Sequence, residues 1–321
     1  MLIRPTDFVQ KHDKCDTNNF QEGVRSMKHV PVLFLMIIVC SGVAFAETLP
    51  PHTAKIDTGV YSYGDPAQAY FSMFVVTSEG VLAIESVNTN HAKGFVEAIR
   101  AVTDKPIRYL FHSHNHWDHA SGGQVFHDAG ATVMAHEEAY QWMKANPGPD
   151  TMVPDASWSG KRKNVILGGT VLELHYLGMN HGMGMTVFLL PKQRIAYIAD
   201  LVDPQAILFN IVPDFNVKEW ERSLKEVEQM EFDRAIYAHS GKADPLLGGT
   251  KQDVRDYIQF LQDIRGAIYA EFKKGTNWMM IPKAVRLPQY KDWWMYEEWL
   301  PMNVWRILLD DSMGPFPWRP E

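Results

Sequence analysis

Cysteine is nearly absent from this chain: only two of its 321 residues are cysteines, Cys15 and Cys40. Both precede residue 47, so the rest of the chain can form no disulfide bond and offers no thiolate to a metal ion. Any metal site downstream must therefore use histidine and carboxylate ligands.

The chain also lacks an excess of basic residues. Lysine and arginine number 31 against 38 acidic residues, which gives a formal net charge of −7. We expect no nucleic-acid partner, because phosphate binding needs a basic footprint. Internal repeats and low-complexity tracts are missing too, and the length suits one large α/β domain.

Long hydrophobic runs are scarce, and the most apolar one, residues 30–43, is shorter than the roughly 20 residues that a membrane-spanning helix needs. It follows Met-Lys-His at 27–29 and ends in Ala-Phe-Ala at 44–46, which is typical of a secretory signal peptide. Residues 1–46 are therefore predicted to be an N-terminal extension plus this signal. We expect cleavage after Ala46, a periplasmic or secreted bacterial protein, and no stable membrane anchor after cleavage.

Alternating and helical patterns of apolar residues divide the remaining chain into strands and helices. Strands are predicted at residues 55–63, 70–77, 81–86, 107–111, 131–135, 165–177 and 235–238, and residues 185–199 are predicted to be a pair of strands that turns at 191–193. Helices are predicted at residues 92–102, 122–129, 137–145, 217–230 and 254–272. Two groups of strands, each followed by helices, indicate an α/β fold in which two mixed β-sheets pack together with helices outside, an αββα sandwich.

The stretch HSHNHWDH at 112–119 carries four of the thirteen histidines of the chain. Imidazole and carboxylate groups are suitable ligands for Zn²⁺, Fe or Mn. In an extended segment, positions 114, 116 and 118 project together, whereas His119 diverges at the turn, so one loop can serve two metal ions. His112 is additional, and we expect it to be a buried neutral or supporting histidine.

This stretch resembles the HxHxDH signature of the metallo-β-lactamase superfamily, and Gly122 and Gly123 follow as in that family. The resemblance extends from about residue 56 to 242, so residues 47–275 are predicted to be the catalytic domain. It implies seven metal ligands: His114, His116 and His181 for one metal, Asp118, His119 and His239 for a second, and Asp200 as a bridge. The bridging aspartate resembles the glyoxalase II and lactonase branches, but Asp203 stands where those lactonases often have tyrosine.

The resemblance implies a binuclear hydrolase in which a metal-bridging hydroxide is the nucleophile, with Asp118 and Asp200 as catalytic residues. Two Zn²⁺ per chain are expected, although Fe or Mn also suits these ligands. The predicted substrate is a small carboxylic ester, lactone, thioester or amide, and a β-lactam belongs to this set. Two alternatives are a mononuclear iron oxygenase or other redox enzyme, and a non-catalytic metal-stabilised binding protein.

Residues 276–321 form an aromatic-rich C-terminal extension, which includes Tyr290, Trp293, Trp294, Tyr296, Trp299 and Trp305. Two interpretations remain open. These rings pack on the domain or form a homodimer contact, or they form an apolar wall beside the metals. The second interpretation predicts a small-molecule substrate with an apolar or aromatic part.

Overall fold

The computed structural model describes residues 49–65 and 69–314. The chain divides into two units, residues 1–46 and 47–321, and all described residues belong to the second. The predicted signal segment therefore lies outside the described residues.

The described strands form two sheets. The first has the order β1-β2-β3-β4-β5-β6-β7, antiparallel from β1 to β4 and parallel from β4 to β7. The second has the order β13-β12-β11-β10-β9-β8, in which only the β11 and β12 pair is parallel. The strands are β1 Thr53–Asp57, β2 Val60–Asp65, β3 Tyr70–Val76, β4 Val81–Ile84, β5 Ile107–Phe111, β6 Thr132–His136, β7 Ala156–Trp158, β8 Arg162–Leu167, β9 Thr170–Tyr176, β10 Thr186–Leu190, β11 Ile195–Ile198, β12 Arg234–Tyr237 and β13 Gly249–Thr250.

Helices flank both sheets, and most of the long ones begin at a side-chain cap. Asn88 caps α1, Asn216 caps α5, and Thr250 with Asp253 forms a capping box at α6. The helices are α1 Thr89–Val102, α2 Trp117–Ala120, α3 Gly123–Asp128, α4 Glu137–Ala145, α5 Val217–Gln229, α6 Lys251–Lys273, α7 Ile281–Ala284 and α8 Tyr296–Met313, with 3-10 turns η1 Pro245–Leu247, η2 Trp278–Met280 and η3 Pro288–Tyr290.

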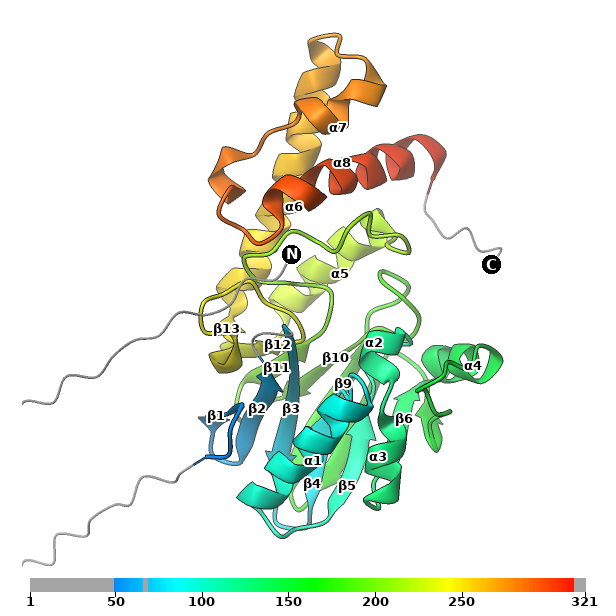
Figure 1. Ribbon diagram of the computed structural model, residues 1–321, viewed down its shortest axis with the longest axis vertical. Helices are drawn as coiled ribbons and strands as arrows, with labels where there is room; N and C mark the ends of the chain where they lie inside the picture. Colours follow the sequence, from blue (N-terminus) through cyan, green and yellow to red (C-terminus); the bar gives the residue numbers. More distant parts are fainter. Residues whose placement is uncertain (1–48, 66–68, 315–321) are drawn as a thin grey trace, which may run out of the picture. The chain divides into compact units, whose positions relative to one another are not determined.

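An apolar core lies between the sheets and continues under the helices of the second sheet. Inward residues of both sheets, such as Leu82, Ile84 and Phe188, share this core with Trp220 of α5 and Tyr257 of α6. A smaller core on the opposite face of the first sheet is closed by α1 and α3, which lie side by side over β4 and β5 (Figure 1). The predicted arrangement of two mixed sheets flanked by helices is thus observed.

Two predicted single strands are hairpins in the structure. The segment 55–63 turns at Gly59, and the segment 165–177 turns at Gly168 and Gly169, with φ angles of +73°, +53° and +75°. Paired residues with positive φ form the tight turn that matches the twist of a two-stranded hairpin, and glycine adopts this conformation without strain. These glycines indicate the turns, which the alternation of apolar and polar residues alone does not.

The C-terminal part is helical and its aromatic side chains divide into two sets. Tyr290 and Tyr296 are buried, and Trp293 stacks on Tyr257 of α6 with ring centroids 5.6 Å apart. Trp294, in contrast, is half exposed. In Figure 1, α7 and α8 gather beside α6, which they contact. Among the described residues, no helix combines the length and the apolar character needed to cross a membrane.

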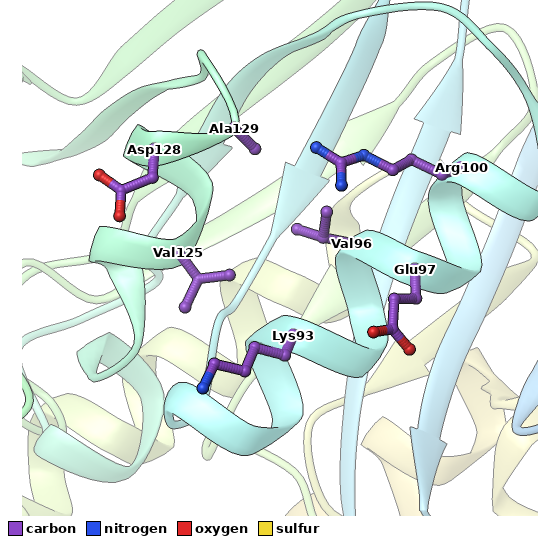
Figure 2. A pocket seen from close by; sticks show the side chains of 7 residues that line it. All are labelled: Lys93, Val96, Glu97, Arg100, Val125, Asp128 and Ala129. Atoms are coloured by element: carbon purple, nitrogen blue, oxygen red, sulfur yellow. The ribbon is translucent and has the colours of Figure 1, made fainter.

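A surface hollow of about 260 Å³ lies between α1 and α3 (Figure 2). Lys93 and Arg100 line it together with Glu97 and Asp128, so both signs of charge face the same hollow. None of the seven predicted ligands takes part in its lining.

Candidate metal centre

The chain delivers all seven predicted ligands from segments that follow strands. His114, His116 and Asp118 follow β5, and the short helix α2 presents His119. His181 follows β9, Asp200 follows β11 and His239 follows β12. Because β9, β11 and β12 run in the same direction, their ends meet at one edge of the second sheet.

Asp200 lies at the centre of the arrangement. Its Oδ2 is 3.1 Å from Nε2 of His181 and 3.7 Å from Nε2 of His114. Its Oδ1 is 3.1 Å from Nε2 of His119 and 3.4 Å from Nε2 of His239. One carboxylate therefore offers one oxygen to each of two histidine groups.

Two groups of ligand atoms result, each with its atoms within 4.8 Å of one another. The first cluster contains His114, His116, His181 and Asp200, and the second contains Asp118, His119 and His239. In the second cluster, Nε2 of His119 lies 3.3 Å from Nε2 of His239 and 3.6 Å from Oδ2 of Asp118.

The donor set fits a pair of divalent cations. Nε2 of His114 is buried and has no hydrogen-bond partner, although it faces Oδ2 of Asp200. An unpartnered buried imidazole nitrogen is unfavourable unless another group binds it, and a metal ion would do so. Histidine nitrogens and carboxylate oxygens are the ligands that zinc, iron and manganese use.

A buried carboxylate that sequence reasoning missed supports the second cluster. Glu85 follows β4; its Oε2 lies 2.7 Å from Nδ1 of His119, and its Oε1 accepts the backbone N–H of Ser113 at 2.6 Å. Its backbone has a φ of +68°, a strained conformation for a residue with a side chain. The bond to Nδ1 leaves Nε2 of His119 directed at the cluster. The only sequence signal was an acidic residue at the end of a predicted strand.

A second missed carboxylate, Asp214, supports the first cluster. Its Oδ2 is 2.6 Å from Nε2 of His116, and its Oδ1 is 3.6 Å from Nδ1 of His181. Burial opposes ionisation, but the hydrogen bond to His116 and the nearby His181 keep the pKa of Asp214 well below its usual value. Asp214 lies in a loop without periodicity, so no pattern of residues indicated its role.

Tyr70 and Asp203 also face the second cluster. The hydroxyl of Tyr70 donates to Oδ2 of Asp118 at 3.0 Å, and its ring lies edge-on to His239 with centroids 4.5 Å apart. Burial and Asp118 raise the pKa of Tyr70, so the hydroxyl stays protonated at neutral pH. Burial raises the pKa of Asp203 to about 7. The nearby Asp200 also raises this pKa, whereas His239 lowers it.

Neighbouring carboxylates favour the charged form of His119. Burial disfavours its charged form, but the carboxylates of Asp200 and Asp118 raise the pKa of His119 well above its usual value. Burial lowers the pKa values of His114 and His181, which therefore stay neutral and can bind a metal through a lone pair. A cation entering the second cluster must displace the proton of His119, so its affinity falls as pH falls.

His112 lies beside the cluster but does not join it. Its side chain is buried, and neither ring nitrogen has a hydrogen-bond partner. Burial, helped by the nearby charge of His119, lowers its pKa to about 3. The ring is neutral at physiological pH.

Two mixed sheets flanked by helices, with paired histidine and aspartate clusters at one sheet edge, define an αββα metal-binding protein. The model of the metallo-beta-lactamase superfamily matches residues 66–239, which include all seven residues of the two clusters. The chain belongs to the metallo-beta-lactamase superfamily.

A curated relative is the 2,4-dinitroanisole O-demethylase subunit alpha of Nocardioides sp. strain JS1661, which is 28% identical over 162 residues. These residues are 50% of this chain and 49% of the relative, so the chain spans about half the length of the curated relative it matches.

Solved structures share the fold at lower identity. A metallo-beta-lactamase from Pontibacter korlensis has a TM-score of 0.58 at 22% identity, covering 65% of this chain and 98% of its own. The stereoselective inverting sec-alkylsulfatase Pisa1 from Pseudomonas sp. has a TM-score of 0.63 at 16% identity, covering 82% of this chain and 50% of its own.

Proposed function

We propose that this protein is a binuclear metal-dependent hydrolase with two zinc ions at the two clusters. The observation that carries the proposal is the position of Asp200, which presents one carboxylate oxygen to each cluster. A structural metal site needs four ligands around one ion, whereas six residues around a shared carboxylate leave coordination positions open for water and substrate.

The chain's own residues would hold and orient the reactants. His114, His116 and His181 would bind one ion, Asp118, His119 and His239 the other, and Asp200 both. When bound, such a pair of ions supplies hydroxide at neutral pH and stabilises negative charge that develops on the substrate. Asp118, held by Tyr70, would accept a hydrogen bond from the attacking water and so orient it.

Metal content tests this proposal directly. We expect about two zinc ions per chain by elemental analysis, loss of hydrolysis on treatment with a chelator, and recovery when zinc is restored. Asp118→Asn should abolish hydrolysis without unfolding the protein. One iron per chain together with oxygen uptake would instead support the oxygenase alternative, and hydrolysis that survives Asp118→Asn would contradict the proposed role of this carboxylate.

We further propose a substrate with an apolar or aromatic part. The ring of Trp299 lies 5.2 Å from Phe209 and 5.0 Å from Trp294, measured between centroids, and both Phe209 and Trp294 are more than half exposed. The backbone of Trp294 pairs with Gln205 and Ile207, in the loop that follows Asp200.

Trp294 also lies beside the loop that carries His239. A side chain at Gly241, two residues after His239, would come within 3.1 Å of Cβ of Trp294. An exposed aromatic ladder so close to two ligand loops gives an apolar substrate a surface to bury, whereas the rings that pack on α6 are already covered.

Trp294→Ala tests the substrate preference, with Trp278→Ala as a matched control. Trp278 is similarly exposed, but it packs on Trp305 in the helical extension. We expect Trp294→Ala to raise KM for aryl esters by about tenfold relative to KM for acetyl esters of small alcohols. This is the effect expected when a bound aryl group loses one buried aromatic contact. Trp278→Ala should change neither value. Equal effects of the two variants would contradict an apolar wall at the site.

The similarity to a 2,4-dinitroanisole O-demethylase subunit favours a second candidate substrate, an electron-poor aryl methyl ether. Hydroxide can add to the ring carbon that bears the methoxy group, and expulsion of methoxide then gives methanol and a phenolate. This substitution needs the same nucleophile as ester hydrolysis, and nitro groups stabilise the negative charge that the ring carries.

Product analysis with 2,4-dinitroanisole separates the two ways of losing the methyl group. Hydrolytic cleavage releases methanol and 2,4-dinitrophenolate without oxygen uptake. Oxidative demethylation consumes oxygen and two electrons from a reductant and releases formaldehyde. We expect methanol, with ¹⁸O from labelled water in the phenolate, and formaldehyde would contradict a hydrolytic role for the centre.

We also propose that the protein is exported, on the basis of the signal-like residues 27–46. N-terminal sequencing of the protein from the producing cell should find Glu47 as the first residue. A first residue upstream of Lys28 would contradict export by this signal.

A further inference from the structure

Helix α8 lies beyond the part of the chain that the family model matches, and three polar side chains lie among the apolar ones that it buries. Asn303, Arg306 and Asp310 are each at most 4% exposed. Buried polar groups are unfavourable unless they bind partners, so a helix that carries three of them on one face is expected to hold something in place.

Asp310 pairs with Arg306 within the helix, whereas the hydrogen-bond partners of Asn303 and Arg306 lie in the loop that connects β11 to α5. Nδ2 of Asn303 donates to the carbonyl oxygens of Leu208 and Asn210, at 3.1 and 2.9 Å. The guanidinium of Arg306 donates to the carbonyl oxygen of Phe215. Two side chains of one helix thus fix the loop at both of its halves.

This loop needs support, because its backbone is strained. Asn210 has a φ of +50° and Val212 a φ of +43°. The left-handed region is unfavourable for a β-branched residue such as valine, which adopts it only where the surroundings enforce it.

The end of the loop contacts the first metal cluster. Asp214 accepts from Nε2 of His116 at 2.6 Å, and the ring of Phe215 lies against His181 with centroids 4.0 Å apart. With Nε2 bonded to Asp214, the nitrogen of His116 that remains for a metal is Nδ1. The charge of Arg306 also acts on the loop, because its guanidinium lies close enough to Asp214 for their fields to interact.

We propose that helix α8 is a positioning element of the metal centre. Arg306 and Asn303 hold the strained loop so that Asp214 fixes the ring of His116, and the C-terminal extension thereby sets the metal affinity of the first cluster. This inference rests on the metal centre of the proposed function, but it does not depend on the reaction that the centre catalyses.

The test measures metal affinity rather than activity. In the full chain carrying His239→Ala, which removes one ligand of the second cluster, Zn²⁺ binding to the first cluster is measured by competition with a chromogenic chelator. We expect Asp214→Ala to weaken Zn²⁺ binding about 10- to 100-fold, as loss of a group that orients a ligand histidine does. Asp214→Asn, which keeps an acceptor without the charge, should lose less.

Arg306→Met is then compared with Arg265→Met, a matched control. Arg265 of α6 also ties α8 to its surroundings, by ion pairs to Glu221 and to Asp311 of α8. We expect Arg306→Met to weaken Zn²⁺ binding about tenfold and to change the visible spectrum of the Co²⁺ form, because His116 moves. Arg265→Met should leave both unchanged.

Equal losses in the two arginine variants would show that α8 acts only through general stability, and unchanged affinity in Asp214→Ala would show that the loop does not control the cluster. Either result overturns the inference. If Arg306→Met does not fold, Asn303→Leu takes its place under the same criteria. A parent chain that binds no Zn²⁺ at all would overturn the proposed function instead, so the two failures are distinguishable.

Discussion

Glu85→Gln is the sharpest perturbation of the second cluster, because it changes the hydrogen-bonding capacity of one buried group without changing its shape. The carboxylate of Glu85 receives two donors, the backbone N–H of Ser113 at 2.6 Å and Nδ1 of His119 at 2.7 Å. Each oxygen accepts one of them. A glutamine has one acceptor oxygen and one NH₂ group, so one of the two donors must then face another donor.

The magnitude follows from this mismatch. A buried donor left without an acceptor costs about 1–3 kcal/mol, and more where a charged group is involved. If Nδ1 of His119 loses its acceptor, its ring is no longer held with Nε2 toward the cluster. We therefore expect the second Zn²⁺ to dissociate roughly 5- to 150-fold more readily, since about 1.4 kcal/mol corresponds to a tenfold change.

The assay is stepwise Zn²⁺ titration against a chelator, with the melting temperature of the metal-free protein measured in parallel. Glu173→Gln is the matched control, because Glu173 also pairs with a histidine, His175, at 3.0 Å on β9. The control should bind both ions with unchanged affinity. If Glu85→Gln binds both ions as tightly as the unaltered chain, the assignment of Glu85 as the residue that orients His119 is wrong.

Three further changes probe other parts of the site. Tyr70→Phe removes the donor to Asp118 and should lower kcat about tenfold with no loss of bound metal, by steady-state kinetics and elemental analysis. Gly182→Ala places a Cβ within 2.9 Å of Asn115 at a φ of +60°, and should destabilise the protein by more than about 1 kcal/mol in urea unfolding. His112→Phe should flatten the pH dependence of the free energy of unfolding. The pKa of His112 is about 3 in the folded protein and near 6.5 in the unfolded chain. The stabilisation is therefore complete above pH 6.5, and below pH 6.5 the free energy of unfolding falls by up to about 1.4 kcal/mol per pH unit. Unfolding curves of metal-free protein at pH 4.5 to 6.5 measure this slope, and equal slopes in both proteins would contradict the neutral buried state of His112.

The sequence was sufficient for most of the fold because apolar periodicity is a local signal, and for the seven residues at the centre because the family resemblance added three of them to the local histidine cluster. Apolar periodicity located β5 and α4 to the residue, and the density of histidines marked the loop after β5. Family resemblance then placed His181, Asp200 and His239 in order along the chain. The structure brings these residues together, with Asp200 within 4 Å of four of the histidines.

The supporting groups were not predictable for a physical reason. Glu85, Asp214 and Tyr70 reach the ligands from distant parts of the chain, across sequence separations of 34, 98 and 48 residues respectively. Nothing in the residues near each of them indicates a histidine or aspartate partner, because the contact exists only once the sheets are packed. Glu85 and Val212 also adopt positive φ, which the sequence around a non-glycine residue does not predict.

The two clusters differ in solvent access, and this difference separates metal retention from substrate recognition. Side-chain exposure in the first cluster is 0% for His114, 25% for His116, 7% for His181 and 13% for Asp200, and in the second it is 50% for Asp118, 0% for His119 and 20% for His239. The difference between the clusters therefore rests on Asp118. Under the proposed function, we expect a substrate to approach from the side of the exposed Asp118, to which Tyr70 donates. Substitutions near Asp118 should alter the ranking of substrates while the metal content stays constant. Substitutions in α8 or in the loop between β11 and α5 should instead alter the metal content, while the fully metal-loaded protein ranks substrates as before.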